Sequence, residues 1–304
     1  MPIGQFFAAC RLVIVAGKGG VGKTTVTATL ARAAGDAGLN ALICEVEGKS
    51  GLASMFNAPA FGYDEVTLAS GLGPGATGVV RARALTPDRA LVEYLNEHGM
   101  RRISNRLSRS GVLDVVAAAA PGIDDILVLG KVKQLERLAA ADVVLLDAPA
   151  AGHAITFLRA ARSLLDTVRV GPIRDQAREV LELLTDATRS QVMLVTLAEE
   201  TPVNELIDTA YALEDNVGVK LGPVVVNSVL PEVEGLELVE GASGPLADAA
   251  GFRQGRMALQ REQLARLADS LPLPQIHLPQ LFTAAIGPEE LGTLANAFAE
   301  RVHA

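Results

Sequence analysis

The sequence lacks tryptophan, has few aromatic residues and only two cysteines, and carries no excess of basic residues. Cys10 and Cys44 offer no disulfide framework and no C-x-x-C pair for zinc, so we expect a reducing compartment. A net charge of −8 argues against non-specific nucleic-acid binding, which requires a basic surface. No apolar run approaches about 18 residues and no positively charged leader is visible, so we expect a cytoplasmic protein without stable membrane insertion.

Apolar residues make up 49% of the chain, and Ala, Leu and Val carry most of that fraction. This composition is typical of a parallel sheet buried between helices. A chain of 304 residues lies at the upper end for one domain and can bury a sizeable core. We therefore expect one α/β domain over residues 1–304, a doubly wound, mostly parallel sheet with helices on both faces.

The stretch AGKGGVGKTT, from Ala16 to Thr25, contains the pattern G-x-x-x-x-G-K-[ST] of a phosphate-binding loop. An apolar run over 11–15 predicts a strand before it, and residues 24–34 predict a helix after it. The glycines leave backbone N–H groups open to an anion, and the helix N-terminus adds partial positive charge. The loop residues predicted to bind ATP are Gly17, Gly19, Gly20, Val21, Gly22, Lys23, Thr24 and Thr25.

Within this loop Lys23 is predicted to reach the β- and γ-phosphates, and the Thr24 hydroxyl to ligate Mg²⁺. Two alternatives compete. The glycines also fit a dinucleotide fingerprint with Glu45 as its acidic residue, but that pattern leaves Lys23 and Thr24 unexplained. A chance glycine turn requires neither the Lys-Thr pair nor the flanking strand and helix.

Lys18 is a second lysine at the start of the loop, and with it the sequence resembles the deviant Walker A P-loop ATPases. That group includes the ParA and MinD partitioning ATPases, the nitrogenase iron protein, and the arsenite-pump (ArsA) and tail-anchored-protein targeting ATPases. The resemblance implies a dimer in which Lys18 reaches the nucleotide of the partner subunit and takes part in catalysis. The alternative is an ordinary solvated loop lysine.

Later segments are similar to the ArsA-type members of this group. The strand over 40–46 is followed by a segment that resembles D-P-A-x-x-L-x-x-x-F, with Leu52 and Phe56 in register. Glu47 takes the place of the aspartate that positions the attacking water in the family, and Glu45, on the same strand face, is the alternative base. The longer Glu side chain puts fast turnover in doubt, because displacements of about 1 Å can cost about 100-fold in rate.

Two further resemblances concern nucleotide binding. The sequence DAPAAGH, from Asp147 to His153, resembles the switch II motif of ArsA-type ATPases, which implies that Asp147 holds Mg²⁺ through water. Asp147 could instead cap a helix, and His153 is open between a switch contact and a surface residue. Asn227 follows a strand, as in the V-V-N element that binds adenine in the family, with a turn residue as the alternative.

Between these motifs we expect a short helical insertion over about 88–140. It contains an apolar stretch over 111–120, which core packing explains best, and the sequence PGIDD at 121–125, which resembles the family's P-G-I-D-E signature. Strands and helices then alternate: helices over 173–187 and 203–215, and strands over 191–197 and 223–228. Residues 231–252 are predicted to be a mobile surface segment, before a helix over 253–270, a strand over 274–278 and a helix over 288–304.

The sequence thus predicts an ArsA-like, Mg-ATP-binding dimeric ATPase that couples nucleotide binding and hydrolysis to dimer rearrangement and to an unknown protein client. Its partner is an identical chain or a paralogue. Two alternatives stay open: a regulatory module that binds ATP with little turnover, and a partitioning ATPase like ParA or MinD. The latter would need a basic face or a C-terminal amphipathic helix, and neither is visible in the sequence.

Overall fold

One eight-stranded sheet organises the chain in a computed structural model that describes residues 2–46, 51–71, 77–97, 99, 122–236 and 243–303. The strand order is β3-β4-β2-β5-β1-β6-β7-β8. β3 pairs antiparallel with β4, and the other described pairs are parallel. The strands are β1 (Leu12–Gly17), β2 (Ala41–Val46), β3 (Val66–Ser70), β4 (Val79–Leu85), β5 (Val143–Ala150), β6 (Ser190–Leu197), β7 (Val224–Val229) and β8 (Gln275–Pro279). The predicted mostly parallel α/β fold is confirmed.

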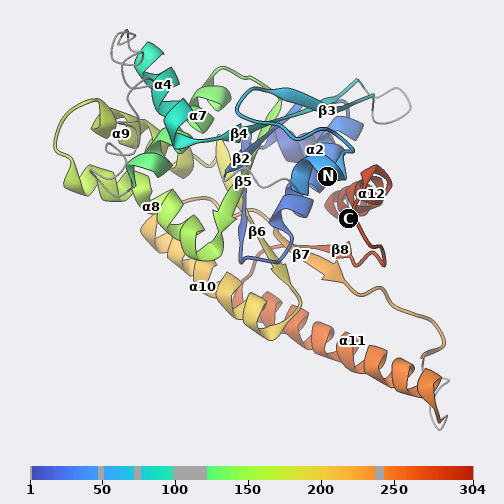
Figure 1. The fold of residues 1–304 in the computed structure, drawn as a ribbon. Coiled ribbons are helices and arrows are strands. Elements are labelled where there is room, and N and C mark those ends of the chain that lie inside the picture. Colours follow the sequence, from blue (N-terminus) through green and yellow to red (C-terminus); the bar gives the residue numbers. More distant parts are fainter. Residues whose placement is uncertain are drawn as a thin grey trace.

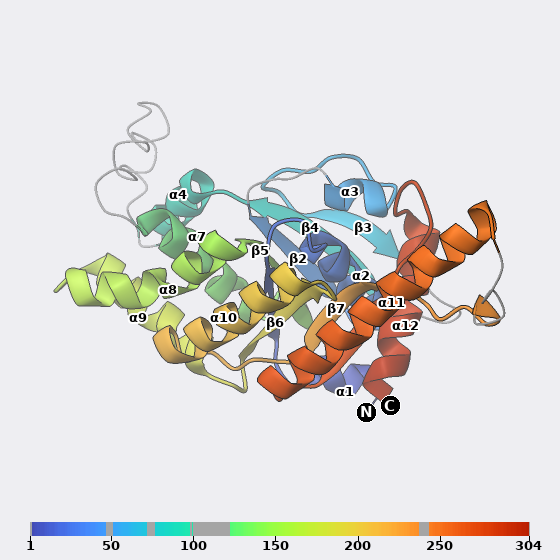
Figure 2. The same cartoon turned by 90° about the horizontal axis from the view of Figure 1, so that it is seen from below.

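Helices cover both faces of this sheet (Figures 1 and 2). Alternate strand residues point to opposite faces: Val13 and Val15 pack with α2 and α12, whereas Leu12 and Ile14 pack in the core that contains α7, α8, α9 and α10. The helices are α1 (Ile3–Ala8), α2 (Lys23–Asp36), α3 (Gly51–Met55), α4 (Pro87–Glu97), α7 (Ile123–Arg137), α8 (Ala151–Thr167), α9 (Pro172–Thr185), α10 (Glu200–Asn216), α11 (Pro245–Ser270) and α12 (Pro288–His303).

The strand order places the glycine loop at the centre of the carboxyl edge of the sheet. β1, a fully buried run, lies between β5 and β6. In the sheet, β2, β4 and β5 lie on one side of β1, and β6, β7 and β8 lie on the other. The strand order therefore reverses at β1. Ligands of open α/β sheets bind at such a reversal of strand order, so the fold positions the loop as a binding site.

The two ends of the described chain lie side by side (Figures 1 and 2). The ring centroids of Phe6 in α1 and Phe298 in α12 are 5.5 Å apart in an edge-to-face arrangement, and Phe7 joins them. Aromatic pairs of this geometry add about 0.5–1.5 kcal/mol beyond the area they bury. α12 is thereby packed on the body of the fold.

The structure contains elements that the sequence-based prediction lacks. We assigned none of β3, in which only Leu68 is buried, α1, α3 and α8. The prediction of a mobile surface segment over 231–252 is wrong for its last part, because α11 already begins at Pro245. Gly244 and Pro245 form a helix start, in which the missing N–H of proline costs nothing.

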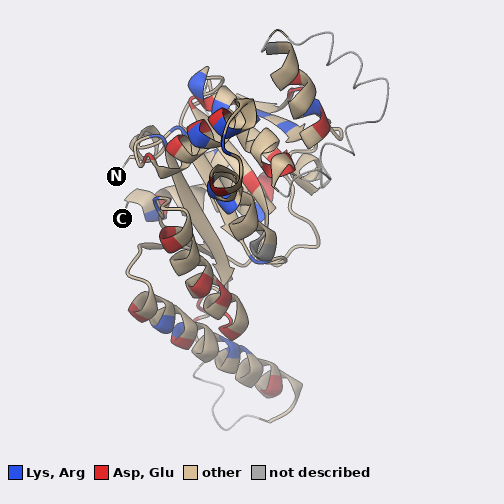
Figure 3. Ribbon diagram, turned by 90° about the vertical axis from the view of Figure 1, so that its left-hand side faces the viewer, with Lys and Arg blue, Asp and Glu red and all other residues tan. Residues whose placement is uncertain are grey.

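Charge is mixed over the molecule: Figure 3 shows Lys and Arg interspersed with Asp and Glu along the ribbon. Among the described helices, none is both long and apolar enough to cross a bilayer.

Candidate nucleotide-binding site

The glycine loop runs from the end of β1 to the start of α2 and packs closely on the neighbouring strand. A Cβ atom on Gly17 would lie 2.3 Å from the carbonyl oxygen of Val195 in β6. The register pairs these two residues directly. The first glycine of the motif is therefore required for the close approach of two backbones.

Gly22 is the last loop residue and the N-cap of α2, with φ at +90°. A Cβ atom there would lie 2.2 Å from Nδ2 of Asn227. That Asn227 amide donates a hydrogen bond of 3.0 Å to the carbonyl oxygen of Val21, and only 8% of Asn227 is exposed. Asn227 thus ties the end of β7 to the loop. Its role at adenine stays a prediction.

We expect Gly22→Ala to destabilise the protein more than Gly20→Ala does. Gly20 has nearly the same φ, +88°, but a Cβ atom there meets nothing within 4 Å. Both substitutions carry the left-handed backbone cost of about 1–2 kcal/mol. Gly22→Ala also displaces Asn227 and breaks a hydrogen bond worth about 1 kcal/mol.

Urea unfolding of the two variants measures the difference between these costs. Equal losses of unfolding free energy in Gly22→Ala and Gly20→Ala would contradict the role of Asn227. The double variant Gly22→Ala/Asn227→Ala removes the colliding amide, so it is expected to lose less stability than the sum of its single variants.

The two loop lysines have different partners. The Lys23 ammonium, at the start of α2, donates a hydrogen bond of 3.1 Å to the carbonyl oxygen of Lys18. The Lys18 ammonium forms an ion pair with Glu205 of α10. The predicted phosphate-binding lysine is therefore at the loop, whereas the predicted trans-acting lysine is held by a carboxylate of its own chain.

The oxygen atoms predicted to hold magnesium lie together. The Thr24 hydroxyl donates a 2.7 Å hydrogen bond to Oδ2 of Asp147, which is 6% exposed. The register places Asp147 of β5 opposite Val15 of β1. A hydroxyl and a carboxylate are hard oxygen donors of the kind Mg²⁺ prefers, so these residues fit the cation. α8 begins only at Ala151, so Asp147 lies within β5 and does not take the alternative role of a helix cap.

Glu45 lies beside this pair. It is directly opposite Asp147 in the β2–β5 register and is 3% exposed. Two residues earlier on the two strands, Ile43 and Leu145 pack on the α2 side of the sheet, so alternation directs both carboxylates toward the N-terminal end of α2. Glu47 lies outside the described residues.

A cavity of about 370 Å³ adjoins the end of β5, where Asp124 and Asp125 of α7 and His153 of α8 share its wall with apolar residues. Burial raises the pKa of both carboxyl groups, and the negative charge of Asp124 raises the pKa of Asp125 further, against the opposing effect of His153. The His153 residue itself is exposed. Its proposed switch contact stays a prediction.

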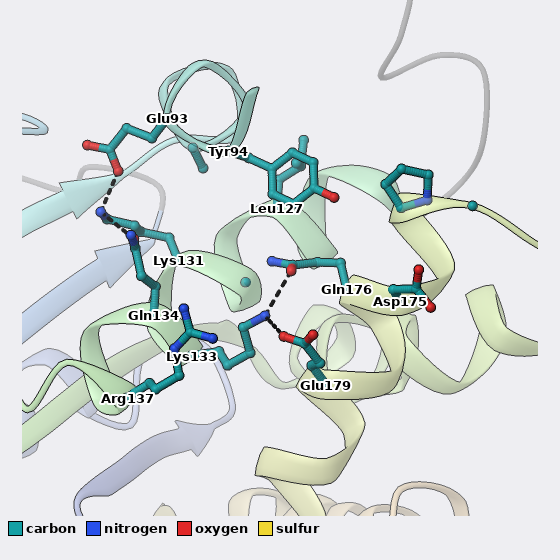
Figure 4. A pocket seen from close by; sticks show the side chains of 14 residues that line it. Glu93, Tyr94, Leu127, Lys131, Lys133, Gln134, Arg137, Asp175, Gln176 and Glu179 are labelled. Carbon is teal, nitrogen blue, oxygen red and sulfur yellow. Dashed lines mark hydrogen bonds and ion pairs between the residues drawn. The ribbon is translucent and has the colours of Figure 1, made fainter. Parts of the chain in front are cut away.

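A second cavity, about 350 Å³, lies between α4 and α7, which fall in the region expected to be a helical insertion, and α9, which follows that region (Figure 4). Its charges largely compensate one another. Lys133 reaches from α7 to Glu179 and, at 2.8 Å, to the amide oxygen of Gln176, while Lys131 pairs with Glu93. These contacts join three helices and make no contact with the glycine loop. The apolar stretch predicted at 111–120 lies outside the described residues.

Sequence reasoning missed Glu205 and the contact of Asn227 with the loop. Glu205 is 187 positions from Lys18, and Asn227 is 206 positions from Val21, so no spacing within a motif points to either contact. The signal that could have indicated Glu205 is the order of the strands. α10 follows β6, the neighbour of β1, so its first turns lie near the loop.

Comparison with known proteins agrees with the motifs. The profile of the family described as anion-transporting ATPase matches residues 10–170. The chain is 30% identical to ATPase BagA of Mycobacterium tuberculosis, over 88% of this chain and 87% of the relative. It is 26% identical to an arsenical pump-driving ATPase of Acidiphilium multivorum, over 72% of this chain and 39% of that protein.

Proposed function

The chain belongs to the anion-transporting ATPase family, and from this premise we propose that it is a Mg-ATP-dependent dimeric ATPase. Membership supports nucleotide binding and ATPase activity in general. The finer proposal is that nucleotide binding closes two subunits and that hydrolysis changes their packing. The observation that carries the Mg-ATP site is the 2.7 Å contact between the Thr24 hydroxyl and the Asp147 carboxylate, directly beside the glycine loop.

In this proposal each residue of the site has one task. Lys23 binds the β- and γ-phosphates, Thr24 ligates Mg²⁺, Asp147 holds it through water, and Asn227 contacts adenine. Bound Mg-ATP supplies the phosphoryl group and the divalent charge that neutralises it. Lys18 supplies a cation to the nucleotide of the partner subunit, and Glu47 orients the attacking water.

We further propose that residues 1–304 form one P-loop domain that engages an unknown protein client. The continuous sheet from β1 to β8 and the packed termini support one domain. A candidate surface for client binding is α11, which exposes three large apolar side chains. They are Leu246, Phe252 and Leu259, at 81%, 73% and 54% exposure. The second subunit is an identical chain or a paralogue.

A partitioning role like that of ParA or MinD receives less support. α12 buries its apolar side chains, among them Leu291 and Phe298, against the body of the fold, so it does not offer that face to a membrane. Basic and acidic residues also alternate over the ribbon (Figure 3).

ATP binding and ATP turnover, measured separately, test the proposal. We expect calorimetry to detect Mg²⁺-dependent ATP binding, a steady-state assay to detect phosphate release, and light scattering to detect a doubled mass with ATP. Binding without turnover or dimerisation would favour the regulatory module instead. No ATP binding would reject the assignment of the loop.

We expect Glu47→Gln to slow hydrolysis by about 100-fold or more while ATP remains bound, because the amide no longer accepts a proton from the attacking water. Glu45→Gln, near the end of β2, is the matched variant. Loss of turnover in Glu45→Gln alone would assign the base to Glu45, which is directly opposite Asp147. Loss in neither variant would contradict a carboxylate base at this strand end and favour the regulatory module.

A further inference from the structure

Glu205 is the residue that decides where the Lys18 ammonium lies. Lys18 follows β1 directly, and Glu205 lies on the second turn of α10, the helix that follows β6. β1 and β6 are neighbours, with Gly17 paired to Val195, so the ends of both strands meet at the loop. This topology brings a cation and a carboxylate that are 187 positions apart into an ion pair.

The backbone of Lys18 has a separate contact, since its carbonyl oxygen accepts a 3.1 Å hydrogen bond from the Lys23 ammonium. The Lys18 side chain, at 36% exposure, can leave Glu205 without breaking that hydrogen bond. Next to it Gly19 and Gly20 are exposed, and a Cβ atom on Gly20 meets nothing within 4 Å. No packing of Gly20 opposes a change in this part of the loop.

The Lys18 ammonium lies against Glu205 of its own subunit, and bringing the phosphates of a second subunit to the same ammonium places them against the negative charge of that carboxylate. Resting on the proposed function, we propose that Glu205 is a positioning residue that retains the Lys18 ammonium in its own subunit until a nucleotide-bound partner replaces the carboxylate. The phosphates of a bound nucleotide present more negative charge than one carboxylate, which favours the exchange.

The exposure of the Lys18–Glu205 ion pair determines how strongly it retains the ammonium. The Lys18 and Glu205 side chains are 36% and 40% exposed, and ion pairs of such exposure contribute little in water. The pair therefore reduces the population of subunits with an available Lys18 by a small factor, about two- to five-fold. A retention of this size biases assembly without preventing it.

The first test measures the chemical accessibility of the Lys18 ammonium directly and does not depend on ATPase activity. Glu205→Gln keeps the shape of the side chain and removes its charge, so we expect Lys18 to be acylated about two- to five-fold faster in limited labelling followed by peptide mass spectrometry. Lys220, whose ammonium contacts a carbonyl at the other end of the sheet, is the internal reference. Glu205→Asp retains the charge on a shorter side chain. Its rate of Lys18 acylation is expected to lie between that of the unchanged protein and that of Glu205→Gln.

The second test measures the assembly of subunits through the concentration dependence of turnover. Glu205→Gln is expected to lower the protein concentration at which ATP turnover per subunit is half maximal, by about two- to five-fold. Glu199→Gln is the matched control, because Glu199 is the N-cap of α10 and its 3.1 Å ion pair with Arg256 is about as exposed.

Unchanged Lys18 labelling in Glu205→Gln overturns this inference and leaves the proposed function standing. An equal shift of the half-maximal concentration in Glu199→Gln also overturns it. Faster labelling in a protein that never self-associates with ATP would reject the proposed function, and with it the exchange between subunits.

Discussion

The Lys23→Ala variant is expected to lose ATP binding. The Lys23 ammonium places a positive charge against the glycine loop, where its hydrogen bond to the Lys18 carbonyl shows that the side chain turns back over the loop. Removing one partner of a charged, desolvated contact costs about 2–5 kcal/mol, equivalent to a loss of affinity from about 30-fold to several thousand-fold.

Calorimetric titration with Mg-ATP measures this loss. Lys220→Ala is the matched control, because Lys220 is exposed and precedes β7, at the opposite end of the sheet from the loop. Circular dichroism and the unfolding midpoint should be unchanged in both variants. An ATP affinity in Lys23→Ala equal to that of Lys220→Ala would reject the phosphate-binding role of the loop.

The Lys18→Ala variant is expected to keep ATP binding and to lose turnover. A cation supplied in trans contributes about 10³- to 10⁵-fold to the rate in other phosphate-loop enzymes. The substitution should therefore lower kcat by about that factor, while the dissociation constant for ATP stays close to that of the unchanged protein. ATP-dependent dimer closure should be lost together with turnover.

Single-turnover assays and light scattering with ATP measure these two losses. A Lys18→Ala protein with normal turnover would indicate a solvated loop lysine whose contact with Glu205 has no catalytic consequence. Loss of ATP binding in Lys18→Ala would instead indicate that Lys18 serves the nucleotide of its own subunit.

The central part of the fold could be predicted from the sequence because its signals are local. The buried strands β1, β2 and β5 are mostly apolar runs, and the glycines, Lys23 and Thr24 follow β1 in a fixed spacing. β3 could not be recognised in the same way. Only Leu68 of its five residues is buried, it lies at the edge of the sheet, and its pairing with β4 makes it a strand.

α11 illustrates a different limit. Gly and Pro before residue 253 favoured an irregular segment, yet Pro245 at the first helical turn begins a 26-residue helix. Two contacts of the site that join distant parts of the chain could not be predicted from motifs either. Thr24 with Asp147 was expected as a shared magnesium site, whereas Lys18 with Glu205 and Val21 with Asn227 follow from strand order alone.

Mixing the two lysine variants tests most directly the claim that each active site combines Lys23 of one subunit with Lys18 of the other. Lys18→Ala and Lys23→Ala proteins are each expected to be inactive alone. In a mixed dimer one of the two sites has both lysines, so equimolar mixing should restore up to about a quarter of the activity of the unchanged protein. Absence of recovery, with mixed dimers confirmed by native mass spectrometry, would contradict the account.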